Sequence, residues 1–141
     1  MFQFAFVGIA GAGAPVVSLD QAASVTDDGF GSNADARIRI GADGVISGYA
    51  ANGGGYTIQG NWVVPTTPYG NDYWVRCTVT AGALTTGTTG SWIDTATGPE
   101  WRCARTTAGT NTATITLEIA SDAAGTTIVA TKAGIVLTAT K

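Results

Sequence analysis

The side chains that most enzymes use for acid–base and nucleophilic chemistry are scarce in this sequence. The chain of 141 residues contains no histidine, which excludes Ser-His-Asp triads, Cys-His dyads and imidazole bases and removes the commonest metal ligand. Its lysines are poor nucleophiles, because Lys141 is the last residue and Lys132 falls in an expected loop. We therefore predict no catalytic residue, no cofactor and no bound metal, and we expect that the protein is not an enzyme.

Paired carboxylates are the catalytic chemistry that the composition leaves open. Asp72, Asp94 and Glu100 could together hydrolyse a glycosidic bond. Acidic residues beside glycine, asparagine or proline, as at Asn71-Asp72, more commonly shape turns. The segment 27–35 (DDGFGSNAD) could offer oxygen ligands to calcium, but its spacing does not match an EF-hand. We interpret these acids as turn residues.

Glycines near the start imitate a phosphate-binding loop only superficially. Gly8, Gly11 and Gly13 precede Pro15 and Val16, and not a helix whose N-terminus would bind a phosphate. The net charge is −3 and the seven lysines and arginines are scattered, whereas nucleic acid requires a basic stripe that neutralises phosphates. We expect neither a nucleotide cofactor nor a nucleic-acid partner.

Two cysteines, Cys77 and Cys103, each lie on an expected strand with an aromatic or apolar neighbour two residues earlier. A disulfide bond between them is one interpretation, and it would stabilise the fold by about 3 kcal/mol. Two buried thiols in a protein made in a reducing cytoplasm are the other.

Aromatic residues crowd the middle of the chain and allow two interpretations. Aromatic rings stack on sugars, but more often they fill a sandwich core or an interface. Packing is the favoured interpretation. The candidates for an exposed, sugar-binding surface are Trp62, Tyr69 and Trp74.

Composition and periodicity indicate strands. Hydrophobic residues make up 45% of the chain and charged residues only 12%, and threonine, which suits a pleated, half-exposed surface, is abundant. Apolar and polar residues alternate with a period of two between glycine-rich turns. In residues 36–40, for example, Ile38 and Ile40 should face inward and Arg37 and Arg39 should face water. We expect strands over residues 2–9, 16–19, 36–40, 45–49, 62–64, 73–79, 91–94, 101–103, 112–120, 127–131 and 135–139.

The uncharged N-terminal segment alternates in the same way. Phe2, Phe4 and Phe6 alternate with Gln3 and Ala5, which favours a first strand or an arm that docks on another subunit. The segment lacks the positive region of a signal peptide and is too short to span a bilayer. We expect synthesis in a cytoplasm and no membrane insertion.

These patterns predict an all-β protein, an immunoglobulin-like or jelly-roll-like β-sandwich. We place the sandwich domain at residues 36–141 and an N-terminal strand or arm at residues 1–35, docking on the sandwich or on a neighbouring subunit. A surface this poor in charge would be poorly soluble if it were bare, which suggests that other protein subunits cover it.

The chain from Trp62 onward has a pattern of tryptophans, arginines and alternating strand residues. The pattern consists of Trp62 and Pro65 and the segments 73–76 (YWVR), 87–92 (GTTGSW), 101–105 (WRCAR) and 109–119 (GTNTATITLEI). In this pattern the chain resembles small tail-associated and virion structural proteins of tailed bacteriophages. The first 35 residues do not share this resemblance.

The resemblance implies a virion component that is assembled in the bacterial host cytoplasm and repeated as a homo-oligomer. Its partners would be other virion proteins, its position the tail tip or fibre or the capsid surface, and it supplies no catalytic residues to transfer. The alternative from a different class is a carbohydrate-binding or cell-surface adhesion module, with a host surface glycan as partner.

Overall fold

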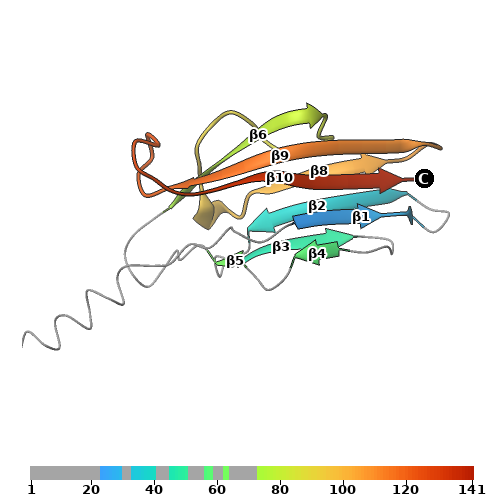
Figure 1. Cartoon of the computed structure of the whole chain (residues 1–141), viewed down its shortest axis with the longest axis horizontal. Coiled ribbons are helices and arrows are strands. Elements are labelled where there is room, and N and C mark those ends of the chain that lie inside the picture. The colour runs from blue at the N-terminus through green and yellow to red at the C-terminus, as the bar shows by residue number, and fades with distance from the viewer. Residues whose placement is uncertain (1–22, 30–32, 41–44, 51–55, 59–61, 64–72) are drawn as a thin grey trace, which may run out of the picture.

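The fold is built around its two longest strands. The longest are β9 (Thr110–Ala120) and β10 (Ile128–Thr140), which form an antiparallel hairpin (Figure 1). On β9 the side chains of Ala113, Ile115 and Leu117 are buried while the threonines between them point outward. The computed structural model describes residues 23–29, 33–40, 45–50, 56–58, 62–63 and 73–141.

This hairpin forms the centre of a six-stranded sheet with the strand order β4-β1-β10-β9-β6-β7. Its pairs are antiparallel except for β1 and β10, which are parallel. Parallel neighbours need a long connection, and here almost the whole sandwich lies between them in the sequence. The added strands are β1 (Ala23–Asp27), β4 (Tyr56–Ile58), β6 (Trp74–Gly82) and β7 (Ile93–Asp94).

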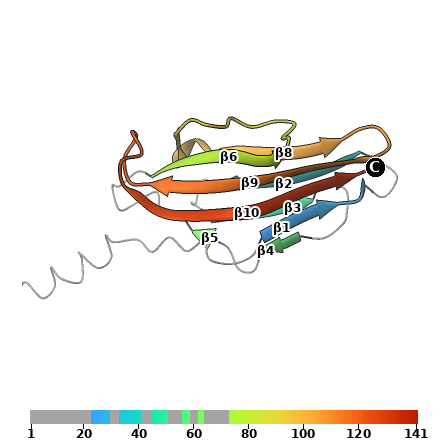
Figure 2. The same cartoon turned by 45° about the horizontal axis from the view of Figure 1, so that its top comes forward.

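A four-stranded sheet, antiparallel throughout, has the order β5-β3-β2-β8. The two sheets form two layers (Figure 2), with β10 packed over β2 and β8, and β1 over β2 and β3. The strands of this sheet are β2 (Ala34–Ile40), β3 (Val45–Ala50), β5 (Trp62–Val63) and β8 (Glu100–Arg105).

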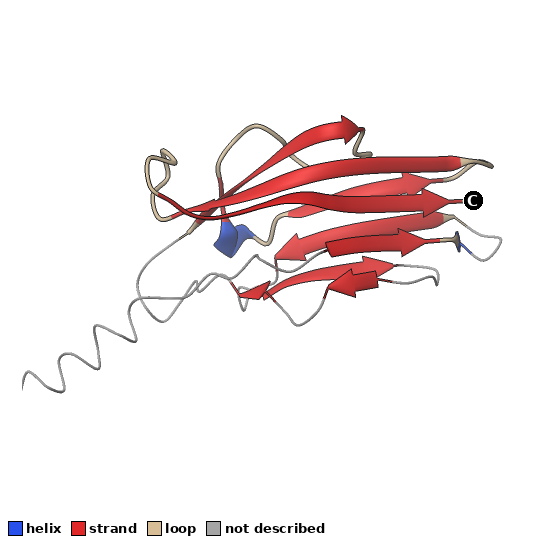
Figure 3. Cartoon of the chain, in the orientation of Figure 1, coloured by secondary structure: helices blue, strands red, loops and turns tan. Residues whose placement is uncertain are grey.

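The structure confirms the prediction of an all-β sandwich. Strands make up both layers, and the blue helix of Figure 3 is a short 3-10 turn, Thr95–Thr97. Within the described part of the chain, no helix is long and apolar enough to cross a membrane. Whether the sandwich is of the immunoglobulin or the jelly-roll type stays a prediction.

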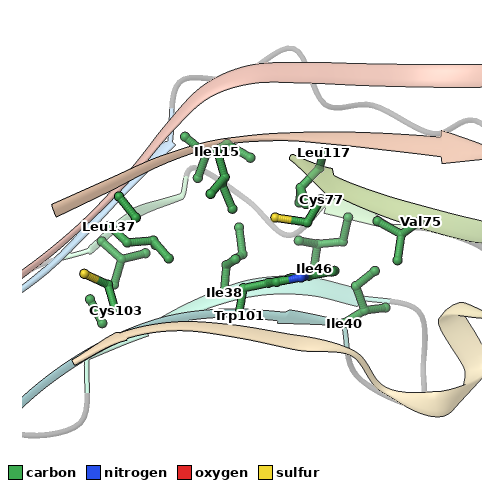
Figure 4. Close-up of a cluster of buried hydrophobic side chains, with 14 of the residues drawn as sticks. Ile38, Ile40, Ile46, Val75, Cys77, Trp101, Cys103, Ile115, Leu117 and Leu137 are labelled. Atoms are coloured by element: carbon green, nitrogen blue, oxygen red, sulfur yellow. The ribbon is translucent and has the colours of Figure 1, made fainter. Parts of the chain in front are cut away.

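The core lies between the two layers and contains the side chains that alternation places inward. Figure 4 shows Trp101 among aliphatic side chains of both sheets. Burial of each large apolar side chain contributes about 1.5–3 kcal/mol. The largest fully buried side chains are Trp101, Ile38, Ile40, Ile46, Ile115, Leu117, Ile119, Ile135, Leu137, Val25 and Val75.

Three predicted boundaries differ from the structure. Residues 23–27 form β1 inside the six-stranded sheet, so this part of the predicted arm belongs to the sandwich, and β2 begins at Ala34. In the segment 27–35, considered above as a source of calcium ligands, the side chains of Asp27 and Asp35 are buried. The two strands predicted at 127–131 and 135–139 are one strand, β10, which begins at Ile128 and has register shifts in its pairing to β9.

The segment between β6 and β8 covers an open strand edge. The backbone N–H groups of Thr85 and Thr86 donate to the carbonyl of Arg102, and the Arg102 N–H donates to the carbonyl of Thr86. The hydroxyl of Thr85 accepts a 2.6 Å hydrogen bond from the N–H of Ala104. Exposed strand edges favour aggregation, and this segment therefore protects β8.

Candidate interaction surfaces

Several residues proposed as contacts from the sequence lie outside the described residues or are described only in part. Phe2, Phe4, Phe6 and Tyr69 are outside them. Trp62 is placed by its backbone in β5, opposite Ile46. The roles predicted for these residues therefore stay predictions.

Trp74 lies on β6 and its side chain is half-buried. It pairs with Ala120 on β9 and with Asp94 on β7. Its alternation places it on the outer face of the six-stranded sheet, together with Arg76 and Thr78, as the sequence predicts.

Trp92, which directly precedes β7, contacts two parts of the same sheet. The guanidinium of Arg76 stacks on its ring at 4.7 Å from the centroid, and Arg76 also donates a 2.8 Å charged hydrogen bond to Glu118. Trp92 also lies against Gly125 in the β9–β10 turn, where an added Cβ would lie 2.1 Å from the indole. Trp92 therefore fastens the turn to the sheet.

The centre of the six-stranded sheet presents a broad hydroxyl-rich surface on its outer side, the threonine face. Each of its side chains alternates with a buried one along β1, β6, β9 or β10. A threonine hydroxyl can both donate and accept a hydrogen bond. The members of the threonine face are Thr26, Thr78, Thr80, Thr112, Thr114, Thr116, Val136, Thr138 and Thr140.

Two charged residues that point outward on β6 and β9 lie at one end of the threonine face. They are Arg76 and Glu118, which stand opposite each other on β6 and β9 and neutralise each other. The hydroxyl of Thr80 donates to the carbonyl of Thr114 at 3.2 Å. The threonine face is thus polar and neutral, with Thr80 at the register shift between β6 and β9.

The outer side of the four-stranded sheet is different, because charged residues gather there. We call these residues the arginine patch. β2 supplies Asp35, Arg37 and Arg39, β8 supplies Glu100 and Arg102, and β3 supplies Tyr49. Arg37 stands directly opposite both Tyr49 and Arg102 in the sheet, and Arg39 stands opposite Glu100.

Asp35 is the centre of the ion pairs in the arginine patch. It is only 7% exposed and accepts a 2.8 Å hydrogen bond from Arg37 and two hydrogen bonds from Arg102. Burial raises the pKa of Asp35, but the hydrogen bonds from Arg102 and Arg37 outweigh burial and lower this pKa below its usual value. Asp35 therefore stays charged at neutral pH.

Two of the acids considered for catalysis or calcium binding, Asp94 and Asp27, accept hydrogen bonds from the backbone. Asp94 accepts a 2.9 Å hydrogen bond from the N–H of Ala96, and Asp27 accepts bonds from Gly29 and from Asp35. Asp94 lies in one sheet and Glu100 in the other, while Asp72 is outside the described residues. Among the residues that the structure describes, no three acidic, cysteine or histidine side chains form a group that could hold a metal ion.

Cys77 and Cys103 are buried free thiols, so the disulfide interpretation is wrong for this structure. Cys77 lies opposite Leu117 on β9, whereas Cys103 interacts with the backbone of Ala139, which lies opposite Asn111 on β9. Positions six residues apart on a strand are separated by roughly 20 Å, and a disulfide needs Cα atoms within about 7 Å. Figure 4 shows the two thiols in separate parts of the core.

Tyr49 is the interaction residue that the sequence does not reveal. Its side chain is 43% exposed, and the guanidiniums of Arg37 and Arg39 lie 5.5 and 5.8 Å from its ring centroid. The alternation of Arg37 and Arg39 is visible in the sequence. The register that sets Tyr49 beside them is not, because a shift of one residue would turn Tyr49 to the other face.

The chain was compared with protein-family models, curated proteins and solved structures, and none of them matches it.

Proposed function

We propose that this protein is a structural subunit of a bacteriophage virion, a β-sandwich repeated on the tail tip or fibre or on the capsid surface. The observation that carries the proposal is the threonine face, a neutral, hydroxyl-rich surface in a chain with few charges. The resemblance of the chain from Trp62 onward to tail-associated proteins supports the same function.

The threonine face has the chemistry of a contact between copies. Hydroxyls that donate and accept can pair with the same face of another subunit, and the methyl groups bury apolar area without leaving a charge unpaired. Charged residues are depleted from the centres of protein interfaces in the same way. We infer that other virion proteins, including further copies of this chain, cover the threonine face.

The test is to locate the protein in particles. Antibodies raised against the purified chain should label particles from a lysate of the phage or prophage that encodes it, at the tail end or over the shell. Labelling at the tail end or over the shell would decide between the two positions. If the protein remained wholly in the particle-free fraction of a lysate with complete particles, the virion function would be wrong.

A further inference from the structure

The arginine patch concentrates positive charge in an acidic protein. The net charge of the chain is −3, yet Arg37, Arg39 and Arg102 lie together on the outer side of the four-stranded sheet. With Asp35 and Glu100 among them, the patch carries three positive and two negative charges, a net charge of +1. An excess positive charge on a surface attracts anionic ligands.

The excess charge resides on Arg39. Asp35 is paired with Arg37 and Arg102, and Glu100 lies 3.5 Å from Arg37. Arg39 is exposed, and none of the ion pairs among the described residues includes it, although Glu100 is its neighbour across the sheet. A guanidinium in this position can offer two parallel N–H donors to a carboxylate.

Tyr49 supplies the second half of a binding site. Its ring is 43% exposed and lies 5.8 Å from the guanidinium carbon of Arg39. The C–H face of a sugar ring can stack on an aromatic ring of this kind, which contributes apolar contact area at a small cost in conformational entropy. The guanidinium of Arg37, which donates a 2.8 Å hydrogen bond to Asp35, also lies over the Tyr49 ring, 5.5 Å from its centroid.

We propose that Arg39 and Tyr49 bind an acidic sugar, with the carboxylate of one uronic acid residue on the Arg39 guanidinium and its pyranose ring on Tyr49. One uncompensated cation beside one aromatic ring matches one carboxylate on one ring. Nucleic acid would require several cations to neutralise successive phosphates, and a peptide of acidic residues would offer no ring to stack on Tyr49. The site therefore fits an acidic polysaccharide.

Titration of the whole chain with trigalacturonate, followed by the amide NMR signals of residues 37–40 and 47–50, tests the proposal. Neutral galactotriose and triglutamate are the comparison ligands. We expect saturable binding of trigalacturonate that weakens at high salt, and binding of the other two that is at least tenfold weaker. Equal binding of triglutamate would show a purely ionic contact and overturn the stacking of a sugar on Tyr49.

Variants assign the binding to the two residues. Arg39→Ala should weaken binding of trigalacturonate at least tenfold, because a charged hydrogen bond is lost. Arg39→Lys should weaken it less, since the charge remains but the paired donors do not, and Tyr49→Leu should weaken it several-fold. Lys141→Ala removes the same charge elsewhere and should leave binding unchanged.

Two results would overturn the site: undetectable binding of trigalacturonate, or an Arg39→Ala variant that binds it within twofold of the original chain. The amide spectrum of each variant shows whether it is folded. Because the titration uses the isolated chain, its failure would leave the virion function untouched, and absence from particles would not affect sugar binding.

Discussion

Gly125 and Gly134 have almost the same backbone conformation but different surroundings. Their φ angles are +72° and +73°, both in the left-handed region. An added Cβ at Gly125 would lie 2.1 Å from the indole of Trp92, whereas at Gly134 it would meet nothing within 4 Å. The pair therefore separates the cost of backbone strain from the cost of a steric clash.

We predict that Gly134→Ala lowers the free energy of unfolding by about 1–2 kcal/mol, the cost of the left-handed backbone for alanine. Gly125→Ala should lower it by about 1–3 kcal/mol more, since Trp92 must also move. Urea denaturation of both variants measures the difference. Equal losses in the two variants would mean that Trp92 does not fasten the β9–β10 turn.

Burial of the two thiols should affect both their reactivity and the pH dependence of stability. Burial raises the pKa of Cys77 from 9.0 to about 12, and burial also raises the pKa of Cys103. The thiolate is the reactive form. Iodoacetamide at pH 8 should therefore leave both thiols of the folded protein unmodified and should modify both in denaturant, as measured by mass spectrometry.

The same shift makes the protein less stable in alkali. Above pH 9 the unfolded chain loses the Cys77 proton while the folded chain keeps it, so the stability present below pH 9 declines as the pH rises towards 12. The expected slope is about −1.4 kcal/mol per pH unit for each such thiol. Cys77→Ala should show a smaller slope. In the iodoacetamide experiment, rapid modification of the native protein at pH 8 would contradict the burial of the thiols.

At the scale of elements, the outer edge of β8 is covered by another segment of the chain. The segment between β6 and β8 is tied to the outer edge of β8 by backbone hydrogen bonds and by the hydroxyl of Thr85. Trp101, fully buried, donates a 2.8 Å hydrogen bond from its indole to the carbonyl of Thr88 in the same segment. The core thus holds the segment that protects the edge.

We predict that Thr85→Val lowers the free energy of unfolding by about 1 kcal/mol, because the N–H of Ala104 loses its protein acceptor. The amide of Ala104 should exchange its hydrogen faster, and the variant should aggregate more readily. Thr89→Val is the matched control, since no hydrogen bond of the Thr89 side chain is present in the described part of the chain. Unchanged exchange at Ala104 in Thr85→Val would show that the hydroxyl does not protect this edge.

At the scale of the whole molecule, the threonine face and the arginine patch lie on opposite outer sides of the sandwich. A subunit built in this way can pack through one sheet and leave the other exposed. The proposed self-contact and the proposed sugar site therefore use different surfaces and do not compete.

We predict that the purified chain self-associates through the threonine face. The double variant Thr114→Lys with Thr116→Lys should dissociate the oligomer in sedimentation velocity experiments, because it buries two unpaired charges at the contact. The double variant Thr106→Lys with Thr107→Lys adds the same charge in an exposed turn and should leave the oligomer intact. A chain that is monomeric at every concentration would rule out this self-contact.

The sequence by itself determined the fold class and the direction of many side chains. Alternation placed Ile38 and Ile115 inward and Arg37 and Arg39 outward, and the structure confirms these positions. It missed β1 because the segment ASVTD has a single large apolar residue, Val25, too little for a pattern of period two. The pairing of β1 with β10 and its packing over β2 and β3 place that side chain in the core.

Only the tertiary structure decided which side chains meet. Cys77 and Cys103 both face the core, as expected from the sequence, yet they lie on different sheets and far apart along the strands. The arginine patch joins three strands whose relative register is set by long-range hydrogen bonds. Alternation is a local property that residue types fix, whereas register depends on the packing of the whole sandwich.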